Sequence, residues 1–156
     1  MHRSSIKYMG YFRDKYVSKL KDPTILDVGS RKVSARSYRW TYRDVFKDYK
    51  YTGMDIIAGR NVDIVGWENI LGRYDVLVTG QVMEHVRQPW NWLIYLTEYF
   101  KKYICIIVPH TCDEHRHPID TYRYFPDGMR DLFEYARIKE VEIIKGKYET
   151  VGIGGL

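Results

Sequence analysis

Three short apolar runs in the first half of the chain each end in an acidic, a glycine or a small polar residue. They are residues 25–30, 51–56 and 74–81. Such runs are typical of buried parallel strands, which are apolar on both faces and open into loops at their carboxyl ends. In open α/β sheets ligands bind at those ends, where the strand order reverses. The pattern therefore predicts a parallel sheet with a ligand site, and it favours a nucleoside-type ligand.

Helical and extended patterns alternate along the rest of the chain. This alternation predicts an α/β fold with a doubly wound, Rossmann-like and mostly parallel sheet, closed by an antiparallel terminal strand. We expect one domain over residues 1–156, with an N-terminal helix in residues 1–22 and a Rossmann-like core in residues 23–156. The helices are expected near residues 6–20, 35–46, 90–101 and 126–135, and the strands near 24–28, 51–55, 62–65, 75–78, 103–108, 139–144 and 149–153.

The distribution of apolar residues and cysteines indicates where in the cell the protein is located. No window approaches the ~20 apolar residues that a membrane span requires, and the N-terminus lacks the apolar stretch of a signal peptide. Cys105 lies in an apolar strand pattern and Cys112 in a loop, which favours reduced thiols over a disulfide. We therefore expect a soluble, cytoplasmic protein without a membrane partner, and the sequence specifies no oligomeric state.

Residues 36–43 interleave basic and aromatic side chains. Such a stretch could contact the phosphates and stack on the bases of a nucleic acid. It is also the pattern of an amphipathic helix whose aromatic side chains enter the core while its arginines face water. We favour the helix, because helical patterns readily explain such stripes, and the net charge of +5 favours an anionic partner only mildly.

The loop after the first strand distinguishes between nucleoside cofactors. A dinucleotide-binding loop needs the pattern G-x-G-x-x-G, because its backbone approaches a pyrophosphate closely. Here no glycine follows Gly29 before Gly53, and no G-x-x-x-x-G-K-[ST] phosphate loop occurs. S-adenosyl-L-methionine carries no phosphate. It needs an acid for its ribose hydroxyls, where Asp55 lies, and a cation for its carboxylate, which Arg31 could supply. The sequence therefore favours S-adenosyl-L-methionine as the cofactor.

Several segments also share their order and spacing with one protein family. They are residues 27–30, Asp55, and residues 74–78, 82–86, 108–111 and 115–126. On these segments the chain resembles a class I S-adenosylmethionine-dependent methyltransferase of the small type 11 kind. The resemblance spans most of residues 24–134. It implies a minimal methyltransferase core, methyltransferase activity and the same cofactor.

The resemblance further implies roles by position. Residues 27–30 would contact the methionine end of the cofactor, residues 55–56 the ribose and adenine, and residues 80–81 would lie beside the sulfonium. Trp67 could stack on the adenine, or Glu68 could accept its amino group. The predicted cofactor contacts are Asp27, Val28, Gly29, Ser30, Asp55, Ile56, Trp67, Gly80 and Gln81.

The loop after the fifth strand is rich in metal-ligand residue types. It contains His110, Cys112, Asp113, Glu114, His115 and His117. Zinc accepts such ligands, but the spacing is not that of familiar zinc sites, so we expect no metal. The loop could also be held by hydrogen bonds to its histidines. We favour a third interpretation, in which the loop lines an acceptor pocket and His110 or His117 acts as a general base.

The pair Glu84 and His85 follows the fourth strand and allows two interpretations. His85 could face the acceptor while Glu84 orients the loop, or Glu84 could stabilise the start of the next helix by its charge. The first is favoured, because both residues lie at a ligand-binding strand end. The predicted catalytic residues are therefore His85, His110 and His117.

These patterns predict methyl transfer from S-adenosyl-L-methionine to a small polar acceptor, such as a sugar or a nucleotide-linked metabolite. The polar, histidine-rich loop and the absence of an added recognition domain motivate this choice. An RNA or DNA methyltransferase is the first alternative, supported by residues 36–43. A catalytically degenerate binding protein is the second, because the first motif lacks two of its expected glycines.

Overall fold

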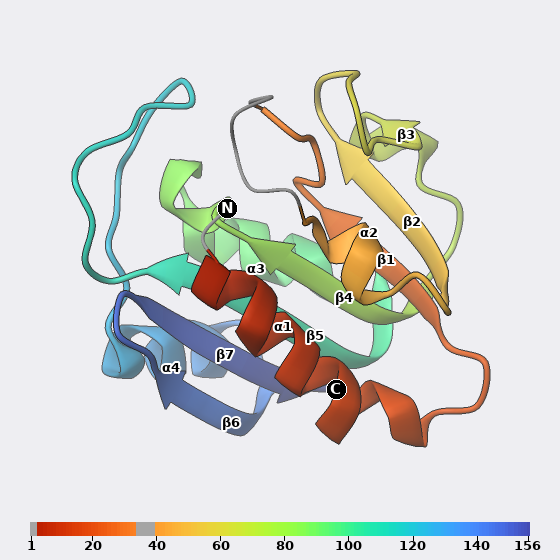
Figure 1. The fold of residues 1–156 in the computed structure, drawn as a ribbon. Coiled ribbons are helices and arrows are strands. Elements are labelled where there is room, and N and C mark those ends of the chain that lie inside the picture. The colour runs from red at the N-terminus through yellow and green to blue at the C-terminus, as the bar shows by residue number, and fades with distance from the viewer. Residues whose placement is uncertain (1–2, 34–39) are drawn as a thin grey trace.

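The computed structural model describes residues 3–33 and 40–156, and one sheet runs through this part of the chain (Figure 1). Its strands are β1 (Thr24–Val28), β2 (Lys50–Asp55), β3 (Ile64–Val65), β4 (Tyr74–Gly80), β5 (Phe100–Pro109), β6 (Lys139–Lys145) and β7 (Glu149–Gly155). Their order across the sheet is β3-β2-β1-β4-β5-β7-β6. β7 runs antiparallel to β5 and β6, and the other neighbours are parallel. The predicted doubly wound sheet with an antiparallel terminal strand is confirmed.

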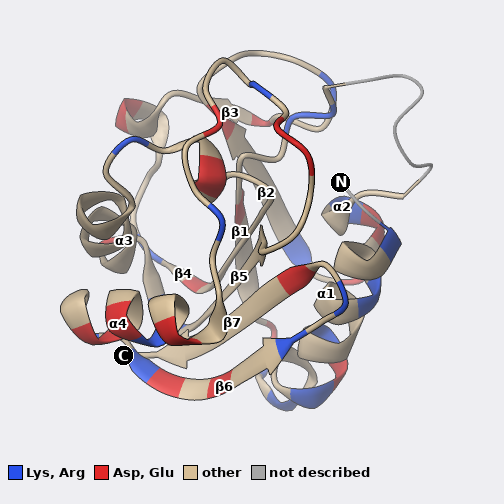
Figure 2. Ribbon diagram, turned by 90° about the vertical axis from the view of Figure 1, so that its left-hand side faces the viewer, with Lys and Arg blue, Asp and Glu red and all other residues tan. Residues whose placement is uncertain are grey.

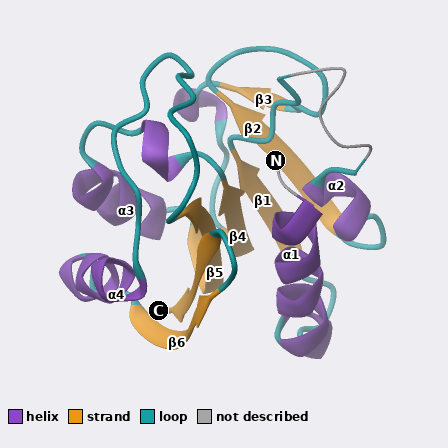
Figure 3. Cartoon of the chain, turned by 60° about the vertical axis from the view of Figure 1, so that its left-hand side comes forward, coloured by secondary structure: helices purple, strands orange, loops and turns teal. Residues whose placement is uncertain are grey.

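Helices cover both faces of the sheet. They are α1 (Arg3–Lys15), α2 (Tyr42–Val45), α3 (Pro89–Thr97) and α4 (Pro126–Tyr135), with short 3₁₀ turns at Val17–Lys19, Trp67–Asn69 and Met83–His85. α1 and α2 lie on one face, and α3 and α4 lie on the other (Figure 1, Figure 3). Charged residues lie mainly on helices and loops, whereas the central strands consist mostly of uncharged residues (Figure 2).

Strand β1 is buried on both faces because its side chains alternate between two apolar clusters. Ile25 packs with Val76 under α1 and α2, and Leu26 packs with Leu77 under α3 and α4. All four side chains are fully buried, and each such burial stabilises the fold by about 1.5–3 kcal/mol. This double burial fixes β1 at the centre of the sheet.

The helix expected at residues 35–46 is found only in its last part, as α2. Residues 34–39 lie outside the described residues. Tyr42 is fully buried, and the Arg43 guanidinium pairs with the Asp63 carboxylate at 2.5 Å. In the described part of the basic and aromatic stretch, the Tyr42 ring thus enters the core, as the amphipathic interpretation predicts, whereas the Trp40 side chain is 56% exposed.

The sequence predicts reduced thiols and no membrane span, and the structure gives one observation on each. Both Cys105 and Cys112 are free, and burial raises the pKa of the Cys105 thiol. No helix among the described residues is long and apolar enough to cross a membrane.

Candidate functional site

The carboxyl ends of three strands meet at one edge of the sheet. Val28 at the end of β1 lies beside Met54 of β2 and Thr79 of β4, and the loops after these strands gather at this edge (Figure 3). Gly29 and Ser30 turn the chain sharply, and both donate their backbone N–H to the carbonyl of Met54, at 2.9 and 3.0 Å. Gly29 has a φ of 80°, a left-handed conformation that favours glycine.

The loop after β1 lies against the loop after β4. A Cβ atom at Gly29 would overlap with the side chain of Val82, so this approach requires glycine. Beside Val82, the side-chain amide of Gln81 is buried, and neither its Oε1 nor its Nε2 has a hydrogen-bond partner among the described residues. A buried polar group without a partner costs about 1–3 kcal/mol. This amide is therefore available to a polar ligand.

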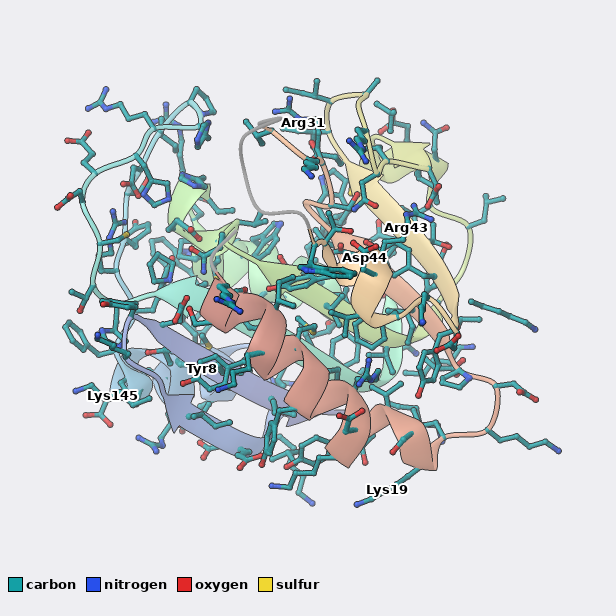
Figure 4. All side chains as sticks on the ribbon, in the orientation of Figure 1. Tyr8, Lys19, Arg31, Arg43, Asp44 and Lys145 are labelled. Carbon is teal, nitrogen blue, oxygen red and sulfur yellow. The ribbon has the colours of Figure 1, made fainter. Side chains whose placement is uncertain are left out.

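Asp55 ends β2 and connects its loop to the loop after β1. Its carboxylate accepts hydrogen bonds from the backbone N–H of Arg31 at 3.2 Å and of Ile57 at 3.1 Å. The Arg31 Nε lies 3.8 Å from the same carboxylate, and Figure 4 shows Arg31 above this edge of the sheet. A carboxylate has about four acceptor positions. Asp55 is thus held in place while keeping acceptor capacity for a ligand.

A cavity of about 310 Å³ lies on the outer side of these loops. It is lined by Lys32, Thr41, Arg43, Asp44, Arg60, Asn61, Val62 and Asp63. Gly29, Asp55 and Gln81 do not line it. The cavity is therefore a separate feature from the meeting point of the three strand ends.

The histidine-rich loop after β5 is bound to the turn that follows β4. Thr121 donates its backbone N–H to the carbonyl of Glu84 at 2.8 Å. Nearer the histidines, the Arg123 guanidinium donates to both carboxylate oxygens of Asp120, at 2.6 Å each. These bonds hold the pKa of the Asp120 carboxyl well below its usual range. The loop is thus fixed against the end of β4 rather than extended into solvent.

This arrangement brings Glu84, His85 and His115 together. The Glu84 side chain is fully buried, and the Nε2 atoms of His85 and His115 each lie 3.8 Å from its Oε1. Burial raises the pKa of Glu84 to about 8 and lowers the pKa of His85. The exposed ring of His117 lies 5.7 Å from the ring of His85, between centroids. Two of the predicted catalytic histidines, His85 and His117, are therefore neighbours.

His110 lies apart from this cluster, and both of its ring nitrogens are bonded. Its Nε2 donates to the carbonyl of Gly146 at 3.0 Å, so its Nδ1 accepts from the Thr111 hydroxyl at 2.7 Å. The ring also stacks on Phe125, with centroids 5.8 Å apart. These contacts anchor the loop to the turn between β6 and β7. Both ring nitrogens of His110 are engaged within the protein, and a role of His110 as a general base in an acceptor pocket stays a prediction.

Comparison with known proteins identifies the fold. No family model matches the chain, and no curated protein sequence matches it. An S-adenosylmethionine-dependent methyltransferase from Aquifex aeolicus matches in structure with a TM-score of 0.64 at 17% identity, covering 99% of this chain and 98% of that one. The chain has the class I methyltransferase fold.

Two further solved structures match over nearly the whole chain. Magnesium protoporphyrin IX methyltransferase from Synechocystis PCC 6803, with bound S-adenosylmethionine, has a TM-score of 0.67 at 11% identity, covering 99% of this chain and 79% of that one. The N-terminal domain of EvdMO1, in the presence of S-adenosylhomocysteine and D-fucose, has a TM-score of 0.60 at 16% identity, covering 99% and 83%. Identities this low show a shared fold, which agrees with the resemblance seen in the sequence.

Within the methyltransferase fold, five predicted cofactor contacts lie together. They are Gly29, Ser30, Asp55, Ile56 and Gln81. Ile56 is 66% exposed directly beside Asp55. The group therefore combines a buried amide, a carboxylate and an exposed apolar side chain at one edge. This combination fits a nucleoside that carries a polar amino-acid arm.

Asp27 and Val28 of the methyltransferase core point into the interior instead. Asp27 accepts a hydrogen bond from the Tyr51 hydroxyl, and burial raises the pKa of its carboxyl to about 7. Val28 belongs to the apolar cluster under α3 and α4. These two residues are thus placed to support the loop after β1, and direct contact with a cofactor stays a prediction for them.

Trp67 and Gly80 are also engaged within the protein. Trp67 packs edge-on against Tyr95, with ring centroids 5.1 Å apart, so stacking on an adenine stays a prediction. A Cβ atom at Gly80 would overlap with the hydroxyl of Tyr42. Gly80 therefore allows Tyr42 to pack under the end of β4, a role that the sequence pattern did not reveal.

Proposed function

We propose that this chain is a methyltransferase that uses S-adenosyl-L-methionine to methylate a small polar acceptor, such as a sugar or a nucleotide-linked metabolite. The observation that carries the proposal is the buried amide of Gln81 at the carboxyl end of β4, which has no hydrogen-bond partner within residues 3–33 and 40–156. Its neighbours support the same assignment. Gly29 allows close approach of the backbone, and Asp55 offers a carboxylate at the end of β2, where nucleoside ligands bind in doubly wound sheets.

In this proposal, each of the grouped residues contacts a different part of the cofactor. The backbone of Gly29 and Ser30 faces the methionine end, and the Gln81 amide hydrogen-bonds to its polar groups. Asp55 accepts hydrogen bonds from the ribose hydroxyls, and Ile56 covers the adenine. When bound, S-adenosyl-L-methionine supplies an electrophilic methyl group. The protein contributes mainly position, because methyl transfer requires the acceptor atom to lie about 3 Å from the methyl carbon.

The acceptor side is assigned to the histidine cluster. His85 follows Gln81 by four residues, and His117 is exposed beside His85. We assign His117 as the base that takes the proton of an acceptor hydroxyl, since imidazole exchanges a proton near neutral pH. The EvdMO1 domain was crystallised in the presence of D-fucose, which supports a sugar as the acceptor class.

A nucleic-acid acceptor receives less support. Tyr42 is fully buried, and Arg43 is paired with Asp63. The basic and aromatic stretch would need exposed rings for stacking and available cations for phosphates. Tyr42 and Arg43 serve the fold instead, which leaves Trp40, 56% exposed, as the exposed ring in the described part of the stretch.

The proposal is tested by calorimetric titration with S-adenosylhomocysteine and S-adenosyl-L-methionine. We expect micromolar binding of both ligands. Asp55→Ala is expected to weaken binding at least tenfold, because a hydrogen bond to a charged group contributes about 1.5–3 kcal/mol. Asp48→Ala makes the same change on an exposed residue before the opposite end of β2 and should bind like the wild type.

Two outcomes would count against the assignment. Absence of binding to both ligands would leave a degenerate binding protein with the methyltransferase fold. Equal affinity of the wild type and Asp55→Ala would show that the cofactor, if bound, does not lie at the end of β2. With binding established, transfer of a labelled methyl group to a panel of sugars and nucleotide sugars tests the acceptor class.

A further inference from the structure

Three potential ligand atoms from two separate segments converge beside the proposed cofactor site. Glu84 and His85 belong to the turn after β4, and His115 belongs to the loop after β5. The Nε2 atoms of both histidines lie 3.8 Å from Glu84 Oε1, and all three ligand atoms lie within 4.8 Å of one another. A nitrogen and an oxygen 3.8 Å apart are too distant for a hydrogen bond. The carboxylate and the two imidazoles therefore face one another without hydrogen bonds between the carboxylate and either ring.

Glu84 gives an independent sign that a cation belongs here. Its side chain is fully buried, and neither carboxylate oxygen has a hydrogen-bond partner among the described residues. A buried carboxylate without a partner is strongly unfavourable, whereas pairing with a cation or a metal removes the cost. The two oxygens point to a positively charged ligand between Glu84 and the histidines.

The Nδ1 atom of each histidine lies near a carbonyl or carboxylate oxygen, as is typical of metal-binding histidines. His85 Nδ1 donates to the carbonyl of Ile119 at 2.6 Å, which leaves Nε2 unprotonated and directed at Glu84. His115 Nδ1 lies 3.1 Å from the carbonyl of Asp113 and 3.5 Å from the Asp120 carboxylate. Metal-binding histidines almost always donate their other N–H to a carbonyl or carboxylate, because this bond fixes the ring and its tautomer.

We propose that Glu84, His85 and His115 bind a divalent transition-metal cation through one carboxylate oxygen and two imidazole Nε2 atoms. Zn²⁺ binds histidine nitrogen and carboxylate oxygen at about 2.0–2.2 Å, so ligand atoms around it lie about 3–3.5 Å apart. Small side-chain shifts bring the observed 3.8 Å spacings to this range. Two imidazoles disfavour Mg²⁺ and Ca²⁺, which prefer oxygen ligands.

Three protein ligands leave at least one coordination position for another molecule. The turn that carries Glu84 and His85 follows Gln81 directly along the chain, which places the cation on the acceptor side. A divalent cation promotes loss of a proton from an oxygen that it contacts. The inference that the acceptor presents a hydroxyl to this cation, with His117 receiving the proton, rests on the proposed function. The cation site itself does not.

The test is metal binding by the purified full chain after treatment with a chelator. We expect calorimetric titration with Zn²⁺ and with Mn²⁺ to show one equivalent per chain, and elemental analysis to confirm the Zn²⁺ stoichiometry. Glu84→Gln and His115→Ala are each expected to weaken Zn²⁺ binding at least tenfold. Glu114→Gln changes an exposed acid of the same loop, paired with Arg116, and should bind like the wild type.

Two further measurements keep the test independent of folding and of the proposed function. Thermal melts report whether Glu84→Gln folds, and the wild type loaded with Co²⁺ should show visible absorption typical of histidine ligation. The affinity for S-adenosylhomocysteine, measured without metal, separates the two proposals. Zn²⁺ binding without cofactor binding would support the metal site and contradict the proposed function. Less than one equivalent of Zn²⁺, or equal weakening by Glu114→Gln, would overturn the metal site.

Discussion

Asp27 carries a carboxyl group into the centre of the sheet. Its pKa is raised to about 7, chiefly by burial and against the lowering effects of the Tyr51 hydroxyl and the Arg43 charge, while the Asp55 charge adds to the rise. Tyr42 packs beside it and is itself fully buried, with its own pKa raised. The folded protein therefore keeps the Asp27 proton at pH values where an unfolded chain has released it.

This ionisation predicts a pH-dependent stability. The pKa of Asp27 in the folded state, about 7, lies above its ordinary value of 3.8. The contribution of Asp27 to the free energy of unfolding is therefore complete below pH ~4 and is lost as the pH rises through ~7. As a result, the free energy of unfolding falls by about 4 kcal/mol. Asp27→Asn, which stays neutral, should lack this loss. The free energy of unfolding, measured by urea titration from pH 4 to 8, checks it.

The comparison with the variant isolates Asp27 from other groups. Glu84 is also buried with a raised pKa, so the wild type alone would report both residues. The difference in unfolding free energy between the wild type and Asp27→Asn should change across this pH range. A difference in unfolding free energy that stays constant from pH 4 to 8 would contradict a raised pKa of Asp27 in the folded protein.

At the scale of elements, the sequence predicted best where apolar patterning and local signals agree. β1 and α4 have the predicted bounds, because a buried apolar run defines the strand and Pro126 marks the helix start. β5 begins at Phe100, earlier than predicted, since Lys101 and Lys102 obscure the apolar pattern while their backbone still extends the strand. β4 continues to Gly80, where it pairs with Ile107 of β5, and this non-local pairing is not contained in the local pattern.

The contact between the loops after β1 and β4 predicts a difference between two glycine substitutions. Gly29 and Gly72 both have positive φ, at 80° and 73°, so alanine at either position should cost about 1–2 kcal/mol. A Cβ atom at Gly72 meets nothing within 4 Å, whereas at Gly29 it overlaps with Val82. Gly29→Ala should therefore cost about 1–3 kcal/mol more. Urea denaturation measures both, and equal losses would contradict close contact between the loops.

At the scale of the whole molecule, the candidate site was only partly predictable. Gly29, Asp55 and Gln81 come together because each ends a strand of one parallel sheet, and strand ends can be read from apolar runs. The group of Glu84 and His115 could not be read in this way. Its members are far apart in sequence, and hydrogen bonds of the loop after β5 bring them together.

We propose that a cofactor binds where β1, β2 and β4 end. The most direct test is a titration of the ¹⁵N-labelled chain with S-adenosylhomocysteine, followed by amide chemical shifts. We expect the largest shifts on residues 29–31, 55–57 and 80–82. Residues 20–23 and 47–50, which border a cavity at the opposite end of the sheet, should change little. No shifts, or the largest shifts at that opposite end, would show that the cofactor does not bind where β1, β2 and β4 end.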